Sequence, residues 1–314
     1  MKKLVILTGP TAVGKSALSI KLAKAINGEI ISADSMQVYK GMDIGSAKIS
    51  KVEMCGINHH LIDVLEPTDN FDITLFKSMA LKAIDDIYSR GNIPIICGGT
   101  GFYIQSLLYD VDFSEEDSTE KERIRNELEE YVSKYGNDAL HDILKEIDLF
   151  SYNNIPANNV KRVIRAIEFY RLHNFPISKH NEEQHEKESV FDFAYIVIND
   201  DREDLYKRID SRVDKMLDEG LVNEVASIKR LGVNKDNTSY NGIGYREIFE
   251  YLDDQCSLDE AIDNIKKNSR HYAKRQLTWF RREKNVNWIN RNEFNNDELI
   301  LENILLILKE KGII

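Results

Sequence analysis

The chain has only three cysteines in 314 residues, Cys55, Cys97 and Cys256, and no two of them form a C-x-x-C pair. Neither a disulfide framework nor a zinc site is therefore indicated. Apolar runs of membrane-spanning length are also missing, and the first apolar stretch, of four residues, is too short for a signal peptide. We therefore expect a reduced, cytoplasmic protein with no membrane attachment.

The chain also lacks an overall excess of positive charge: its formal net charge is −11. This value favours solubility and argues against general affinity for polyanions. The length is enough for one large core or for two domains, and we find no internal repeat and no low-complexity stretch. Any affinity for nucleic acid must therefore come from a local concentration of basic residues.

The segment GPTAVGKS near the start of the chain has the P-loop spacing G-x-x-x-x-G-K-S. In such a loop the backbone N–H groups surround a phosphate chain, the lysine adds positive charge and the serine hydroxyl binds Mg²⁺. Residues 4–8 predict a buried strand before the loop, and residues 16–26 predict a helix after it whose N-terminus attracts an anion. The predicted phosphate site consists of Gly9, Pro10, Thr11, Ala12, Val13, Gly14, Lys15 and Ser16, with Ser16 as the metal ligand.

Strands and helices alternate in the first third of the chain. Further strands are predicted at residues 29–33, 61–64 and 93–97, and a helix at residues 72–88. This alternation is typical of an α/β protein, with a parallel sheet and helices on both of its faces.

The strand pattern stops near residue 111 and is replaced, from Ser114 to about Lys187, by charged helical sequence. We therefore predict a P-loop-type α/β core of residues 1–112 and 190–314, interrupted by a helical insertion of residues 113–189.

Strand and helix signals return after the insertion. Residues 193–198 predict a strand, and Asp200 with Glu203 predicts a capping box at the start of the next helix. Long helices follow, then an edge strand at residues 286–289 and a final helix from about Asp297.

A P-loop is compatible with kinases, NTPases and several transferases, so other residues must decide the chemistry. An energy-driven NTPase usually has an aspartate after a long apolar strand as its second Mg²⁺ ligand. Here the strand at residues 93–97 ends in Gly-Gly-Thr. The nearest suitable carboxylate is Asp34, at the end of the strand at residues 29–33, where the sites of α/β proteins gather.

Positive charge is concentrated in residues 265–284, which carry eight lysines and arginines and one acid. Lys266, Arg270 and Lys274 are spaced four apart on one helix face, and aromatic residues lie between them. Basic and aromatic groups together suit RNA, but a solvated basic helix with its aromatic residues in the core explains the pattern equally well. A second basic cluster, at residues 161–165, favours nucleic acid.

Arg208 and Arg212 are four residues apart and share a face of a predicted helix. Two interpretations are open from the residues alone. Asp204 or Asp210 could neutralise either arginine, or the two arginines could together bind a diphosphate.

Five motifs together resemble a known family. GPTAVGKS, ISADSMQVYKGMDIGSAK (31–48), CGGTGFY (97–103), NGIGYRE (241–247) and KRQLTWFRR (274–282) are similar to the sequential motifs of tRNA dimethylallyltransferases. The resemblance extends from Leu4 to about Trp288. It is specific, because DSMQVYKGMDIGSAK and KRQLTWFR are not general P-loop features.

The resemblance implies transfer of a dimethylallyl group from dimethylallyl diphosphate to the exocyclic N6 amine of the adenine 3′ to the anticodon of tRNA, with release of pyrophosphate. The P-loop, Arg212 and Arg208 would hold the diphosphate together with Mg²⁺, and Asp34 and Thr100 would serve catalysis. We predict that Asp34 is the general base, because the amine must lose a proton as it bonds to the allylic carbon. An outer Mg²⁺ ligand and a helix cap are the alternative roles for this residue. The insertion would grip the anticodon stem. The implied tRNA-facing residues are Asp34, Ser35, Met36, Gln37, Thr100, Lys121, Arg123, Lys161, Arg162, Arg165, Asn241, Gly242, Gly244, Tyr245, Arg246, Lys274, Arg275, Gln276, Trp279 and Arg281.

Two other functions fit the P-loop. One is a nucleoside or small-molecule kinase that uses ATP at the same loop, and the other is a non-catalytic RNA-binding protein whose loop senses a nucleotide. We expect a monomer, with tRNA and the prenyl diphosphate as its partners and no membrane.

Overall fold

The computed structural model describes residues 1–109 and 118–314, which divide into two compact units. The larger unit contains residues 1–108 and 190–314. The smaller unit begins at Tyr109 and ends at Ser189. The first residues of the predicted insertion, 113–117, lie outside the described residues.

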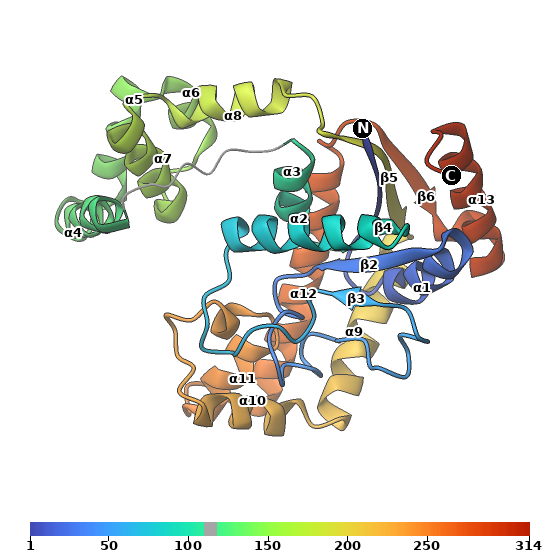
Figure 1. Ribbon diagram of the computed structural model, residues 1–314. Coiled ribbons are helices and arrows are strands. Elements are labelled where there is room, and N and C mark those ends of the chain that lie inside the picture. The colour runs from blue at the N-terminus through green and yellow to red at the C-terminus, as the bar shows by residue number, and fades with distance from the viewer. Residues whose placement is uncertain (110–117) are drawn as a thin grey trace. The chain divides into compact units, whose positions relative to one another are not determined.

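The core of the larger unit is a six-stranded sheet with the order β3-β2-β4-β1-β5-β6, in which every neighbouring pair is parallel (Figure 1). The predicted α/β class with a parallel sheet is therefore confirmed. The strands are β1 (Lys2–Thr8), β2 (Gly28–Ala33), β3 (His59–His60), β4 (Ile93–Gly98), β5 (Phe191–Asn199) and β6 (Val286–Asn290).

The third predicted strand was wrong in its position. The observed β3 ends at His60, and the first three of the predicted residues, 61–63, form a bend. Leu61 has φ of 62° and Asp63 has φ of 55°, and left-handed residues cannot continue a strand. The apolar side chain of Leu61 is buried, but Leu61 lies in the bend after β3 and not in a strand.

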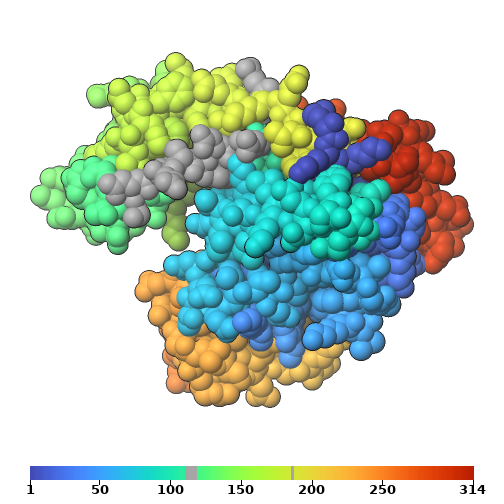
Figure 2. Space-filling view, in the orientation of Figure 1, coloured from blue at the N-terminus to red at the C-terminus, as the bar shows by residue number. Residues whose placement is uncertain are grey.

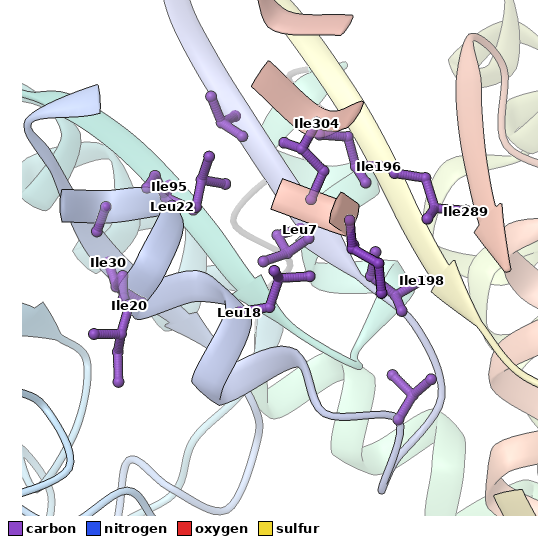
Figure 3. Close-up of a cluster of buried hydrophobic side chains, with 14 of the residues drawn as sticks. Leu7, Leu18, Ile20, Leu22, Ile30, Ile95, Ile196, Ile198, Ile289 and Ile304 are labelled. Atoms are coloured by element: carbon purple, nitrogen blue, oxygen red, sulfur yellow. The ribbon is translucent and has the colours of Figure 1, made fainter. Parts of the chain in front are cut away.

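Helices cover both faces of this sheet. On one face α1 (Lys15–Ile26) and α13 (Asp297–Glu310) lie side by side, and α2 (Ile73–Ser89) and α3 (Gly101–Leu108) pack together on the other (Figure 1). Figure 3 shows the first of these interfaces, where Leu7 and Ile196 of the sheet meet Leu18 of α1 and Ile304 of α13. The alternation of side chains along each strand thus supplies one apolar layer to each helical layer.

The remaining helices of the larger unit are α9 (Arg202–Asp218), α10 (Leu221–Arg230), α11 (Tyr245–Leu252) and α12 (Leu258–Phe280), with short 3₁₀ turns at Ser239–Asn241 and Arg291–Glu293. The predicted capping box at Asp200 was wrong. The N-cap residue of α9 is Asp201, and its side chain makes no capping hydrogen bond. Asp200 is instead ion-paired with Arg208. Among the helices within residues 1–109 and 118–314, none combines the length and the apolar character that crossing a membrane requires.

The described part of the smaller unit is helical and has its own apolar core. It contains α4 (Ser118–Asp142), α5 (Leu144–Ile147), α6 (Leu149–Asn154), α7 (Val160–His173) and α8 (Ile177–Glu186). Its core includes Leu128 of α4, Leu144 of α5 and Ile167 of α7, all of which are buried. Helix α4 is interrupted at Gly136, whose φ of 84° is not helical.

Candidate active site

The P-loop joins β1 to α1 at the carboxyl edge of the sheet. Its tight course requires glycine at Gly9, where φ is 151° and a Cβ atom would lie 2.2 Å from the carbonyl oxygen of Ile198. The Lys15 Nζ donates hydrogen bonds to the carbonyl oxygens of Gly9, at 3.0 Å, and Pro10, at 2.8 Å. The loop is thus folded around its own lysine, and the N-terminus of α1 begins at this point.

Burial of the Lys15 amine disfavours its charged form. Burial lowers the pKa of Lys15 to about 8, and the Arg212 guanidinium contributes further, while Cys97 and Asp34 act in the opposite direction. A bound anion would raise this pKa, because it favours the charged form of the amine.

Next to the P-loop the larger unit contains a cavity of about 250 Å³. Its polar lining includes Thr11 of the P-loop, Asp34 after β2 and Arg212 of α9. Much of the remaining lining is apolar, and those side chains are Met36, Ile209, Val213, Met216, Ile243 and Ile265. The cavity therefore combines a charged end with a lining that suits a small hydrocarbon group.

Asp34 lies at the carboxyl end of β2 and caps the turn that follows it. Its Oδ1 accepts hydrogen bonds from the backbone N–H groups of Met36, at 2.9 Å, and Gln37, at 3.4 Å. Within the described part of the chain, no hydrogen bond to its Oδ2 is found. One carboxylate oxygen thus fixes the side chain, and the other is available to a ligand in the cavity.

The structure separates the two arginines that shared a predicted helix face. Arg208 is ion-paired with Asp200, whereas Arg212 is half-buried with its Nη1 3.5 Å from the Thr11 Oγ1. The two aspartates suggested by the sequence, Asp204 and Asp210, pair instead with Lys207 and Arg270.

Burial lowers the pKa of Arg212 and the Asp34 carboxylate raises it. Arg212 is therefore placed for an anion at the P-loop. Arg208 borders a second, open cavity that Arg212 also lines.

Sequence reasoning missed Arg291, which follows β6. Its Nη1 would lie 3.0 Å from a Cβ atom on Gly14, so the guanidinium lies against the P-loop. This nitrogen is buried and has no hydrogen-bond partner among the described residues, whereas Nη2 binds Asp297. No motif identified Arg291, because the resemblance ends at about Trp288.

Two residues assigned to the tRNA-facing surface must be corrected. Gln276 is buried: its Oε1 accepts from the Thr11 backbone N–H at 2.8 Å, and its Nε2 donates to the Gly99 carbonyl oxygen at 2.9 Å. Tyr245 is fully buried beneath the cavity wall, and its hydroxyl binds Glu224. Both side chains therefore make hydrogen bonds in the interior of the protein, Gln276 to Thr11 and Gly99 and Tyr245 to Glu224.

Thr100 lies between β4 and α3, and its carbonyl oxygen accepts the N–H groups of Tyr103 and Ile104 in the first turn of α3. Burial raises the pKa of Tyr272, which lines the cavity, to about 12, and the neighbouring Thr100 side chain acts in the opposite direction. Thr100 therefore contacts the lining of the cavity from the Gly-Gly-Thr turn.

The basic helix α12 contains both paired and exposed cations. Lys266 and Arg270 are ion-paired with Asp214 and Asp210 of α9, so their charges are directed to a neighbouring helix. The exposed cations of α12 are Lys267, Lys274 and Arg275, and Arg281, directly after the end of the helix, is exposed as well.

The other predicted residues of the larger unit lie around the cavity or on α11 and α12. Ser35, Asn241 and Gly242 line the cavity together with Arg275, and Gly244 is buried. Arg246 is ion-paired with Glu247, and Trp279 packs its ring against Gly101.

In the smaller unit the predicted basic residues lie on α4 and α7. Lys161 and Arg162 are exposed, and Lys121 is half-buried. Arg165 is ion-paired with the fully buried Glu168, which also holds Arg125, and Arg123 pairs with Glu120 and Glu127. The buried Glu168 thus fixes two partly exposed guanidinium groups.

Comparison with known proteins identifies the relatives of this chain. The family model described as IPP transferase matches residues 37–283, and the model described as isopentenyl transferase matches residues 2–69. A tRNA dimethylallyltransferase of Lachnoclostridium phytofermentans is 55% identical over 314 residues, which is 100% of both chains. One of Acetivibrio thermocellus is 49% identical over 313 residues, 100% of this chain and 99% of that one.

Solved structures with the same fold agree with these relatives. The tRNA isopentenylpyrophosphate transferase of Bacillus halodurans is 42% identical, with a TM-score of 0.74 over 99% of this chain and 98% of that chain. A eukaryotic dimethylallyltransferase that acts on tRNA is 28% identical, with a TM-score of 0.79 over 98% of this chain and 80% of that chain.

Proposed function

This chain belongs to the IPP transferase family of tRNA dimethylallyltransferases, and from that premise we propose how its residues divide the reaction. The enzyme transfers a dimethylallyl group to the exocyclic N6 amine of the adenine 3′ to the anticodon, and pyrophosphate leaves. The observation that carries the assignment is that Thr11, Asp34 and Arg212 line one cavity whose other walls are largely apolar.

The diphosphate of the donor binds at the P-loop, between Lys15 and Arg212. Negative charge develops on the leaving pyrophosphate, and fixed cations placed at that point lower the barrier. Arg212 supports this role, since no ion pair to it is found in the described part of the chain. Arg291 is ion-paired with Asp297 through Nη2, and its unpartnered Nη1 beside Gly14 offers one further donor at the loop.

The residues at the loop also fit Mg²⁺. Ser16 is exposed at the start of α1, and Mg²⁺ is commonly held by one or two protein oxygens together with substrate phosphates and water. Within residues 1–109 and 118–314, no cluster of three or more His, Cys, Asp or Glu side chains is arranged to hold a metal. A site shared between Ser16 and the diphosphate is therefore the fitting one, and the metal would offset charge on the leaving group.

Asp34 acts on the acceptor. The lone pair of the adenine amine is delocalised into the ring, so the amine is a weak nucleophile, and it becomes cationic as it bonds to the allylic carbon. While the carbon–oxygen bond to the diphosphate breaks, the Asp34 Oδ2 accepts the N6 proton, a contribution typically worth ~10²–10⁴-fold in rate. The hydrogen bonds to Oδ1 support this role, because they fix the carboxylate and leave Oδ2 available.

The apolar lining serves the donor carbon. Ile209, Val213 and Met216 lie on one face of α9 and line the cavity beside Arg212, which places a hydrocarbon-binding surface next to the diphosphate site. Exclusion of water protects an allylic carbon that is losing its diphosphate from hydrolysis. An adenine within a stacked anticodon loop must be flipped out of the stack to reach this cavity.

The tRNA itself is bound by exposed basic residues. On the larger unit these are Lys274 and Arg275 of α12 and Arg281 directly after it, and on the smaller unit Lys161 and Arg162 of α7. Phosphate contacts of this kind provide most of the affinity and make it depend on salt. We propose that the smaller unit grips the anticodon stem.

Incubation with labelled dimethylallyl diphosphate and unmodified tRNA tests the proposal. We expect label in tRNA and one pyrophosphate released for each group transferred. ATP-dependent phosphate transfer to a small molecule would indicate a kinase instead, and tRNA binding without transfer would indicate a non-catalytic RNA-binding protein.

A further inference from the structure

The carboxylate of Glu224, on α10, binds three consecutive backbone N–H groups of the loop that follows β2. Its Oε2 accepts from Asp43 at 2.9 Å and from Ile44 at 2.7 Å, and its Oε1 accepts from Gly45 at 3.0 Å. The hydroxyl of the buried Tyr245 donates to Oε1 at 2.7 Å. In Figure 2 the residues after β2 (blue) lie directly against those of α10 and α11 (gold and orange).

This loop is a wall of the cavity. Gly45, Ser46 and Ala47 line the cavity, and Gly45 is also the last of the three residues whose N–H groups Glu224 binds. On its other side the loop rests on the Tyr245 ring, since a Cβ atom on Gly45 would lie 2.6 Å from that ring. Glu224 and Tyr245 thus fix the distance between α11 and the cavity lining.

The same loop is connected to the segment that carries Asp34. The Gln37 Nε2 donates to the Ser46 carbonyl oxygen at 3.5 Å, and the Gln37 backbone N–H donates to the Asp34 Oδ1. A shift of the loop would therefore change both the shape of the cavity and the support of Asp34. Misplacement of reacting groups by about 1 Å can cost about 10²-fold in rate.

We infer that Glu224 is a positioning residue for the transfer reaction. It holds the wall formed by residues 45–47, and through Gln37 the turn at Asp34, in the arrangement that aligns acceptor and donor. A carboxylate suits this task because its charge-assisted hydrogen bonds are about twice as strong as neutral ones, and one carboxylate meets a nest of successive N–H groups. The inference rests on the proposed function for its effect on rate, but its effect on the loop is independent of activity.

The experiment compares Glu224→Gln with the wild-type protein and with Glu219→Gln. The control removes the same charge from an exposed glutamate of the same unit, whose ion pair is with Lys215 at the surface. Amide hydrogen exchange is measured over residues 42–48 and over β1 and β4, together with the single-turnover rate and the Kd for tRNA.

For Glu224→Gln we expect exchange at residues 43–45 to accelerate at least about tenfold and exchange in β1 and β4 to stay unchanged. The single-turnover rate should fall by about tenfold or more, and the Kd for tRNA should stay within about twofold, because its surface contacts remain. Tyr245→Phe removes one of the four donors and should change the loop exchange and the rate in the same direction by less. Glu219→Gln should match the wild-type protein.

Three results would overturn the inference. Unchanged exchange at residues 43–45 would mean that Glu224 does not hold the loop. Faster loop exchange with a wild-type rate would mean that the loop does not align the reactants. Faster exchange throughout the sheet, with rate and tRNA affinity falling together in both Glu224→Gln and Tyr245→Phe, would reduce Glu224 to a general stabilising contact. Failure of the wild-type protein to transfer the label contradicts the proposed function instead, and the exchange data still report on the loop.

Discussion

The Gln276 Oε1 accepts a hydrogen bond from the Thr11 backbone N–H at 2.8 Å, and thus joins α12 to the P-loop. The same amide donates to Gly99, so the basic helix, the P-loop and the Gly-Gly-Thr turn are connected through one buried side chain. Gln276→Leu would leave a buried N–H and a buried carbonyl oxygen unsatisfied, each costing about 1–3 kcal/mol.

We therefore expect Gln276→Leu to lower the free energy of unfolding by about 2–6 kcal/mol in urea titrations, and to raise the KM for the donor. Thr278→Val, on the exposed side of the same helix, serves as the control. A Gln276→Leu protein with unchanged stability and unchanged donor KM would contradict the connecting role.

Asp34→Asn should separate proton transfer from positioning. The amide oxygen of asparagine can still accept the N–H groups of Met36 and Gln37, but the side chain cannot accept the N6 proton. We expect the single-turnover rate to fall by about 10²–10⁴-fold with little change in the Kd values for tRNA and donor. Near-normal turnover would exclude Asp34 as the base.

Arg212 and Arg208 should differ although they are neighbours on α9. Arg212→Ala removes a guanidinium that faces the P-loop, so we expect a rise in donor KM and a fall of about 10²–10³-fold in single-turnover rate. Arg208→Ala removes a guanidinium already ion-paired with Asp200 and should have the smaller effect on both. Equal losses in the two variants would show that the ion pair does not withhold Arg208 from the donor.

Donor binding should be coupled to protonation of Lys15. The pKa of this amine is lowered to about 8, and a bound diphosphate raises it, since it favours the charged form. Below about pH 7 the amine is charged before binding, so affinity should be flat. Above pH 8 binding must take up a proton, and the Kd for the donor should rise by up to about tenfold per pH unit.

Calorimetry in two buffers of different ionisation enthalpy measures this proton uptake directly. The variant Lys15→Met should bind the donor more weakly and show no proton uptake above pH 8. A wild-type Kd that stays constant from pH 7 to pH 10 would contradict the coupling.

The exposed cations at the C-terminal end of α12, and Arg281 directly after it, should determine the salt dependence of tRNA binding. In the Lys274→Ala, Arg281→Ala double variant we expect weaker binding and a slope of log K against log[salt] that is smaller by about one unit for each lost phosphate contact. Lys309→Ala, on α13, removes an exposed cation from a helix with no predicted tRNA contact and is the control. An unchanged slope in the double variant would support the solvated-helix interpretation.

The sequence by itself determined the parts of this protein that are set by local patterns. The P-loop, the strand before it and the helix after it could be predicted because glycine spacing and apolar runs are read within about 25 residues. Alternating strands and helices predicted the parallel sheet, and position at the end of β2 identified Asp34. Family motifs then supplied the reaction.

Only the tertiary structure decided which charges are free and which side chains face inward. Arg212 and Arg208 have the same local surroundings in sequence, but Asp200 pairs with one of them and the P-loop faces the other. Gln276 lies within a basic motif that reads as surface, yet its amide binds Thr11 and Gly99. Glu224 belongs to no motif, because its partners lie on a loop about 180 residues earlier in the chain. Hydrogen bonds and ion pairs between distant segments depend on how the chain folds back on itself, and side-chain periodicity reports only which face of its own element a residue occupies.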